Sequence, residues 1–435
     1  MKIFNRFLLV AGCILLFGIS WLITFTKETD TEKQRKLIDE AENYLADKIY
    51  VYSVPLLEEA AQYEGEYTDY AEKRLKGIYT DDLTNSDYRE KYEKLLIKQM
   101  SRENAPDDVF LEAAEFYFNI GESGDAFSVL RNGIAVTKSE DIVKQYESVR
   151  YRFIMGGNIF EYASETYGGV VRIKRNGKWG AASKSGSVVI PCEYDNISTW
   201  SGDRFIVEKD GEIYAINSGN DRIALLHSEA DGFGNISQNR LGILSDGTYI
   251  LSDGGFNISN ISFEELGMFS ENYAPAKVNG KWGLIGLDGI EWLLKPKYQD
   301  IIRDELGRAL MNNSIFVRRD DGTVILLSGG SQTGGPYEDA KPFGDGWAAV
   351  KLNGKWGFVD TQGKVMIDFR FDDALSFGQH LAAVKLGDLW GYVSLNGEIA
   401  IEPQFHEVRS FYNGSAAVLT TAGWQFITLL EYQKG

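Results

Sequence analysis

Three different patterns of hydrophobic and polar residues follow one another along the chain. Residues 7–25 are uncharged and mostly apolar, whereas residues 27–155 carry apolar side chains at three- and four-residue spacing. Residues 156–435 show short β-prone runs separated by glycine-containing turns. These patterns are typical of a membrane-spanning helix, of amphipathic helices and of β-strands. The sequence therefore predicts an α+β multi-domain protein with domains at 1–26, 27–155 and 156–435.

The first segment predicts an uncleaved membrane anchor. It is long enough to cross a hydrocarbon core as a helix, and no small-x-small cleavage site follows it. Because Lys2 and Arg6 precede it, we expect a single-pass protein of the cell membrane with a cytoplasmic N-terminus and the bulk of the chain extracytoplasmic. The alternative is lipoprotein processing at Cys13, since Val10-Ala11-Gly12-Cys13 resembles a bacterial lipobox.

The second segment predicts helical hairpins. Its clearest pair covers 108–136, where Ala114 and Ala126 would let two helices approach closely and Gly121 would begin the turn between them. The spacing of these small and aromatic residues resembles a tetratricopeptide motif, and a generic helical-hairpin bundle is the alternative. A spacer or capping role is the better interpretation, because one or two such units are too few to form a peptide groove.

The third segment predicts β-hairpins at a regular period. In the unit at 348–369, Asn353-Gly354 separates two β-prone runs, and Asn-Gly is the dipeptide that a two-residue type I′ turn favours. Lys-Trp-Gly follows this turn at 355–357 and recurs at 178–180 and 281–283, with Leu-Trp-Gly at 389–391. The tryptophans of the last two motifs, Trp356 and Trp390, are 34 residues apart, and a fixed period of this size indicates a repeat architecture.

These motifs resemble the WG-repeat family, which is common in bacterial surface proteins. The resemblance covers roughly 165–430 and includes a Pro-x-aromatic exit, as in Pro403-Gln404-Phe405. Degenerate units fill the gaps and give a register of eight positions: 179, 214, 249, 282, 324, 356, 390 and 424. Three-stranded antiparallel units cannot bury both faces alone, so we expect a closed, propeller-like ring, with an open β-solenoid as the alternative.

The tryptophans divide into two groups. We assign a structural role inside the repeats to Trp179, Gly180, Trp282, Gly283, Trp356, Gly357, Trp390, Gly391 and Trp424. Trp200, Trp292 and Trp347 fall outside the repeat register and are therefore the candidates for exposed ligand contacts.

Composition restricts the chemistry. The net charge of −18 disfavours binding to nucleic-acid backbones. The three histidines and two cysteines form no metal-ligand spacing, and no nucleophile elbow or phosphate-binding loop occurs, so we expect neither metal, cofactor nor enzymatic activity. Cys192 alone lies beyond the predicted anchor, which excludes an intramolecular disulfide there.

The sequence thus predicts a non-catalytic, envelope-exposed scaffold that binds a protein or another envelope component. A cell-wall glycan-binding module using exposed aromatic residues is the alternative. A carboxylate-dependent hydrolase is a third hypothesis, because acidic residues are abundant.

Overall fold

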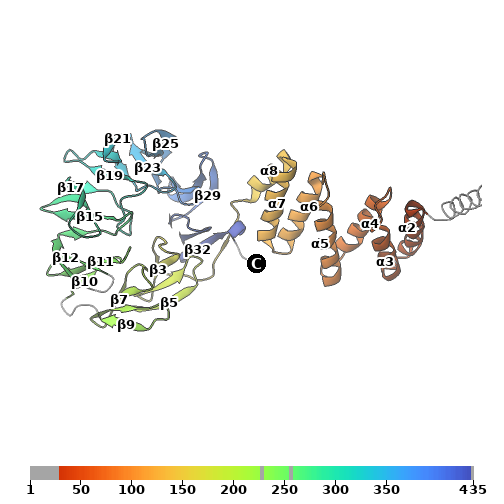
Figure 1. Ribbon diagram of the computed structural model, residues 1–435, viewed down its shortest axis with the longest axis horizontal. Helices are drawn as coiled ribbons and strands as arrows, with labels where there is room; N and C mark the ends of the chain where they lie inside the picture. Colours follow the sequence, from red (N-terminus) through yellow and green to blue (C-terminus); the bar gives the residue numbers. More distant parts are fainter. Residues whose placement is uncertain (1–28, 226–229, 254–257, 433–435) are drawn as a thin grey trace, which may run out of the picture. The chain divides into compact units, whose positions relative to one another are not determined.

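The computed structural model describes residues 29–225, 230–253 and 258–432, and the chain forms two compact units, Met1–Tyr146 and Glu147–Gly435 (Figure 1). The predicted anchor at 7–25 and Cys13 lie outside the described residues. Among the residues that are described, no helix is both long and apolar enough to cross a membrane.

The first unit contains consecutive α-helices connected by short turns. They are α2 (Asp30–Ala46), α3 (Tyr50–Ala60), α4 (Thr68–Thr80), α5 (Ser86–Met100), α6 (Asp107–Asn119), α7 (Ser123–Thr137) and α8 (Glu140–Val149), the last of which continues into the second unit. Helix α2 begins with a capping box, in which Thr29 and Glu32 satisfy each other's backbone N–H groups.

Helices α6 and α7 confirm the predicted hairpin. Ala114 and Ala126 are buried between helices, and Gly121 adopts a positive φ of 85° in the turn. Gly133 is also required to be small, because a Cβ atom there would lie 3.0 Å from the Phe110 ring. The tetratricopeptide likeness of this pair rests on sequence spacing alone and stays a prediction.

Polar contacts connect neighbouring helices in a recurrent manner. The hydroxyls of Tyr79, Tyr92 and Tyr117 donate to glutamates of other helices at 2.7 Å, 2.7 Å and 2.9 Å. Each tyrosine thus buries its ring and still satisfies its hydroxyl group.

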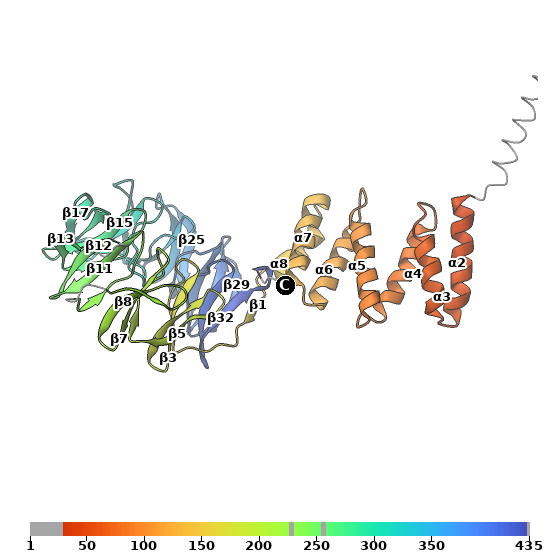
Figure 2. The ribbon, with the colours of Figure 1, turned by 60° about the horizontal axis from the view of Figure 1, so that its bottom comes forward.

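The second unit consists of eight four-stranded antiparallel sheets, the blades, which follow one another around a closed ring (Figures 1 and 2). Blade 1 contains β2 (Tyr162–Ala163), β3 (Val170–Arg175), β4 (Lys178–Ser183) and β5 (Val188–Tyr194); blade 2 contains β6 (Asn196–Ile197), β7 (Phe205–Lys209), β8 (Glu212–Ile216) and β9 (Arg222–Leu225). Blade 3 contains β10 (Gly232–Phe233), β11 (Arg240–Ser245), β12 (Thr248–Asp253) and β13 (Ile258–Phe263); blade 4 contains β14 (Glu265–Leu266), β15 (Tyr273–Val278), β16 (Lys281–Gly286) and β17 (Trp292–Tyr298). Blade 5 contains β18 (Asp300–Ile301), β19 (Ser314–Arg318), β20 (Val324–Ser328) and β21 (Ser331–Tyr337); blade 6 contains β22 (Asp339–Ala340), β23 (Trp347–Leu352), β24 (Lys355–Asp360) and β25 (Val365–Phe371). Blade 7 contains β26 (Asp373–Ala374), β27 (Leu381–Leu386), β28 (Leu389–Ser394) and β29 (Ile399–Phe405).

Blade 8 closes the ring with strands from both ends of the unit. It contains β30 (Glu407–Val408), β31 (Ser415–Thr420) and β32 (Gly423–Leu429), and its fourth strand is β1 (Phe153–Met155), which pairs with β32; the 3-10 turn η1 (Leu430–Tyr432) follows. The predicted closed ring is therefore confirmed as an eight-bladed propeller, and the open solenoid is excluded.

The prediction of three strands per unit was wrong. Each blade begins with a two-residue inner strand immediately after the outer strand of the preceding blade, as Tyr194 and Asn196 show at the end of β5 and the start of β6. So short a strand has no alternating hydrophobic pattern, and the sequence therefore gave no sign of it.

One position of the predicted register also requires correction. The Cα partner of Trp179 in β3 is Lys174, which also faces Tyr162 of the inner strand. The corresponding pairs in blade 2 join Glu208 to Ile213 and to Asn196, so the tryptophan position is occupied by Ile213 and not by Tyr214. The aromatic ring of Tyr214 had suggested the neighbouring position.

The Trp-Gly dipeptide has a steric explanation. Trp282, Trp356, Trp390 and Trp424 are buried, Trp282 with only 4% of its surface exposed, and Trp179 is half-buried. The adjacent glycines lie under the outer strand, whose register shifts opposite them. Cβ atoms on Gly180, Gly283, Gly357 and Gly391 would lie 2.5, 2.3, 2.8 and 2.4 Å from backbone carbonyl oxygens of that strand.

The acidic residue at the start of a blade binds the hairpin turn of the same blade. Asp195 accepts the N–H of the first turn residue, Asp210, at 3.1 Å, and Asp372 accepts that of Gly387 at 2.8 Å. Glu264 and Glu338, which are one methylene longer, accept the N–H of the second, Gly280 and Gly354.

The same acidic residue also forms an ion pair with the lysine of Lys-Trp-Gly in the preceding blade. Lys178 pairs with Asp195, and Lys355 pairs with Asp372 at 2.6 Å. In the unit that begins with Leu389, the acid position is occupied by His406, so both members of the ion pair are replaced together. These partly exposed pairs stabilise the ring by at most about 1 kcal/mol each.

We predict that Gly391→Ala destabilises the propeller by about 1–3 kcal/mol, because the new methyl group collides with the carbonyl oxygen of Ile401. The midpoint of denaturant unfolding, followed by tryptophan fluorescence, measures the change. Gly157→Ala is the matched control, since a Cβ atom there meets nothing within 4 Å, and its midpoint should not move. Equal midpoints for the two variants would contradict the steric explanation.

Candidate functional site

The loops between the first and second strands of the blades lie together at one end of the ring, because the inner strands all run in the same direction. We call them the inner loops: 164–169, 198–204, 234–239, 267–272, 302–313, 341–346, 375–380 and 409–414. Side chains at their second position join adjacent blades. Asn235 accepts the Thr199 N–H at 3.2 Å, and the Ser376 hydroxyl accepts the Ala349 N–H at 3.0 Å.

The inner loop of blade 5, at 302–313, is longer than the others and crosses the mouth of the ring. The carbonyl oxygen of Leu306 accepts a hydrogen bond from Asn235 of blade 3, and that of Gly307 accepts one from Met268 of blade 4, each at 2.9 Å. On the other side, Glu305 accepts the Tyr162 hydroxyl of blade 1 at 3.2 Å. The loop therefore covers one side of the channel mouth.

Asp304 shapes this crossing loop. Its carboxylate accepts the N–H of Leu306 at 3.0 Å and that of Arg308 at 2.8 Å, and it forms an ion pair with the Arg308 guanidinium at 2.6 Å. Leu306 and Leu310, two residues of the loop itself, are buried. The loop is thus held by its own side chains and by both sides of the ring.

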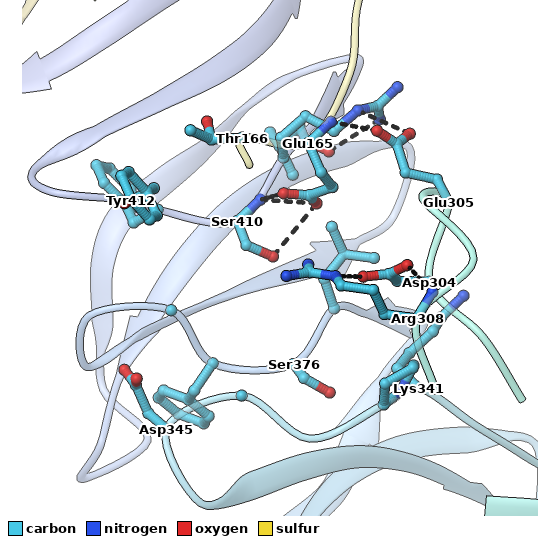
Figure 3. A pocket seen from close by; sticks show the side chains of 18 of the residues that line it. Glu165, Thr166, Asp304, Glu305, Arg308, Lys341, Asp345, Ser376, Ser410 and Tyr412 are labelled. Atoms are coloured by element: carbon cyan, nitrogen blue, oxygen red, sulfur yellow. Dashed lines mark hydrogen bonds and ion pairs between the residues drawn. The ribbon is translucent and has the colours of Figure 1, made fainter. Parts of the chain in front are cut away.

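A cavity of about 650 Å³, the central pocket, remains beside the crossing loop (Figure 3). It is lined by 165–168 of blade 1, Arg303, Asp304, Glu305, Arg308 and Met311 of blade 5, 341–345 of blade 6, Asp373, 375–379 and Trp390 of blade 7, and 407–413 of blade 8. Figure 3 shows Glu165 and Ser410 on one side of this space and Ser376 and Asp345 on the other. A pocket of this size accommodates a small molecule or a side chain of a partner.

Glu165 is the carboxylate at the second position of its inner loop. It accepts the backbone N–H of Ser410 at 3.0 Å and 3.2 Å and the Ser410 hydroxyl at 3.3 Å, so it joins blade 1 to blade 8. Its own N–H donates to Glu305. The bond to Ser410 is the counterpart of the one that Asn235 makes to Thr199, since in both the N–H belongs to the second inner-loop residue of the preceding blade.

The surroundings raise the pKa of Glu165 to about 7. Burial is the largest cause, because neighbouring protein atoms exclude most of the water around a side chain that is half-buried, and the nearby carboxylate of Glu305 is the second. The Ser410 N–H and the guanidinium of Arg409 act in the opposite direction but do not compensate. Glu165 therefore changes its charge near neutral pH.

The basic residues of the pocket contact groups other than Glu165, and Arg303 forms an ion pair with Asp300 at 3.2 Å. Arg409, with 7% of its surface exposed, forms ion pairs with Glu305 at 3.2 Å and Glu407 at 2.6 Å and lies 4.2 Å from the centre of the Trp424 ring. Lys341 lies over the Trp356 ring at 5.3 Å. Within the described ranges, no ion pair involves the pocket carboxylates Glu165, Asp345 and Asp373.

The candidate ligand-contacting tryptophans lie elsewhere. Trp200, Trp292 and Trp347 are half-buried and pack against Phe205, Phe263 and Phe377, with ring centres 4.8, 6.4 and 5.2 Å apart. None of the three lines the central pocket. Their role as ligand contacts stays a prediction.

Sequence reasoning missed Glu165, Glu305 and Arg409. The available signal was the interval between register positions 282 and 324, which is the longest of the eight-unit register and contains the crossing loop. Nothing in the sequence indicated which residues that loop would meet.

The described part of the chain contains no cluster of three or more histidines, cysteines or carboxylates arranged to hold a metal ion. His380 donates its backbone N–H to Asp345 at 2.8 Å, and His406 is exposed. His227 lies outside the described residues.

The raised pKa of Glu165 predicts a pH-dependent effect of Glu165→Gln. The folded protein holds this proton more tightly than the unfolded chain, so the carboxyl lowers stability as pH rises from about 4.5 to about 7, and the cost is constant above that range. Relative to wild type, the variant should therefore gain about 1–2 kcal/mol between pH 5 and pH 8, a figure discounted for partial solvent exposure.

Thermal unfolding at several pH values measures this difference. Glu271→Gln is the matched control, because Glu271 also accepts backbone N–H groups of a neighbouring inner loop but lies outside the central pocket. A difference between Glu165→Gln and wild type that does not vary with pH would contradict the assignment.

Comparisons with known proteins agree with the repeat pattern. The family model described as "WG containing repeat" matches residues 179–212, 257–282, 337–356, 356–390 and 390–421. No curated protein matches the chain. Among solved structures, BamB from Moraxella catarrhalis is 10% identical with a TM-score of 0.38, over 66% of this chain and 96% of that one.

The WD40 β-propeller domain of Doa1 is 12% identical with a TM-score of 0.32, over 62% of this chain and 96% of that one. Likenesses at this level carry no argument, and the propeller assignment rests on the strand pairing itself. The Trp-Gly units, their buried tryptophans and the five family matches together identify the chain as a WG-repeat protein.

Proposed function

We propose that this protein is a non-catalytic recognition scaffold of the cell envelope, and that its propeller presents the central pocket and the surrounding inner loops to a protein partner. The observation that carries the proposal is the central pocket, which combines a cavity of about 650 Å³ with carboxylates that form no ion pair within the described ranges. Unpaired charges beside a cavity are suited to a charged group of a partner.

The envelope location is part of the proposal and comes from the sequence. The segment 7–25 would anchor the chain as a single-pass membrane protein, and the helical unit, with its tetratricopeptide-like pair at 108–136, would be a spacer between the anchor and the propeller. The alternative of glycan binding is disfavoured, because it requires open aromatic faces and the three candidate tryptophans pack against phenylalanines.

A photo-crosslinking experiment tests the proposal. We predict that p-benzoylphenylalanine placed at Thr166, on the wall of the central pocket, captures a protein when the full-length chain is irradiated in its own cells. The control position is Leu386, which is 38% exposed beside a turn at the opposite end of blade 7.

The expected result is a discrete crosslinked protein at Thr166 that is absent at Leu386. Identical patterns at both positions, or crosslinks to wall glycan alone at Thr166, would refute recognition of a protein through this face.

A further inference from the structure

The negative charge of Glu165 has no structural task of its own. The equivalent bond between blades 2 and 3 is made by the neutral side chain of Asn235, so an amide is sufficient at this position. A partly buried charge lowers stability unless it is compensated. A carboxylate at this position is therefore unexplained by the architecture of the ring.

The groups that face Glu165 do not neutralise it. The crossing loop contributes Arg303, Asp304, Glu305 and Arg308, of which Arg303 is paired with Asp300, and the blade of Glu165 contributes Tyr162 and Tyr167. Blades 6 and 7 contribute Lys341, Asp345, Asp373 and Tyr392, and blade 8 contributes Glu407, Arg409 and Tyr412. Arg409 already has two carboxylate partners, and Arg308 is paired with Asp304. Carboxylates outnumber the basic side chains around the cavity.

We propose that the central pocket receives a lysine or arginine side chain of a protein partner, and that the carboxylate of Glu165 forms an ion pair with its cationic group. This inference rests on the proposed function and specifies what the partner must supply. The cavity is large enough for either side chain. Tyr167 and Tyr412 on its wall would pack along the aliphatic stem of the incoming residue.

Such an ion pair links binding to pH. The cation binds the charged form of Glu165, whereas near neutral pH the carboxyl is partly protonated. Binding therefore releases a proton below about pH 7, and the affinity should rise about tenfold from pH 6 to pH 8. A cation bound at another carboxylate of ordinary pKa would show no such dependence in this range.

The experiment uses the full chain in detergent micelles and two short peptides as probes. Acetyl-Gly-Gly-Arg-Gly-Gly-amide and its lysine counterpart are titrated and followed by saturation-transfer NMR of the peptide protons. The citrulline and norleucine peptides are the neutral controls. We expect saturable binding of at least one cationic peptide at pH 8, about tenfold weaker binding at pH 6, and no binding of the neutral peptides.

Glu165→Gln should weaken binding at pH 8 at least tenfold and remove its pH dependence, whereas Glu271→Gln should bind like wild type. The wild-type pH profile and the neutral peptides need no variant, so they test the proposal even if Glu165→Gln folds poorly. Equal binding of the arginine and citrulline peptides, or pH-independent binding by wild type, would overturn it. If Thr166 captures a protein but neither cationic peptide binds, this inference fails and the proposed function stands. If the peptides bind but Thr166 captures nothing, the proposed function fails.

Discussion

The pairing of β1 with β32 is the interaction on which the rest of the propeller depends. Blade 8 has only three strands of its own, and β1 supplies the fourth from the other end of the unit. Backbone bonds continue this junction, with Phe160 and Trp424 exchanging two N–H···O bonds of 2.9 Å. Without the junction, blades 1 and 8 would expose a sheet edge and an apolar face, as an open β-array does.

Within the ring, a small set of contacts is repeated from blade to blade. The tryptophan fills the space within and between blades, the following glycine admits the shifted outer strand, and the acidic residue holds the hairpin turn. The unit with Leu389 has lost both members of the ion pair, because His406 stands in place of the acid. In the unit before Gln299, which also lacks the acid, Lys281 pairs with Asp320 instead. The Lys-Trp-Gly motif is therefore explained by packing and turn formation, and a ligand need not be invoked.

The central pocket arises from the one loop that departs from the repeat. Because the loop at 302–313 reaches blades 1, 3 and 4, it covers one side of the channel mouth and leaves a cavity on the other. Its Glu305 also lies close enough to Glu165 to raise the pKa of that carboxyl. Shape and electrostatics of the pocket thus have the same origin. A deviation from regularity has therefore produced a pocket in which carboxylates outnumber basic side chains.

The sequence by itself determined the repeated part of this protein. The Asn-Gly and Asp-Gly turns, the tryptophan spacing and the change from helical to β periodicity are local signals, because each depends on residues close together in the chain, and they predicted the helical hairpins, the eight units and the favoured ring. Only the tertiary structure decided the fourth strand of each blade, the use of β1 to close blade 8, the packing of Trp200 and Trp347 against phenylalanines, and the meeting of Glu165 with Glu305 and Ser410. Glu165 and Ser410 stand at opposite ends of the propeller sequence, and ring closure alone makes them neighbours. No local pattern can encode such a contact.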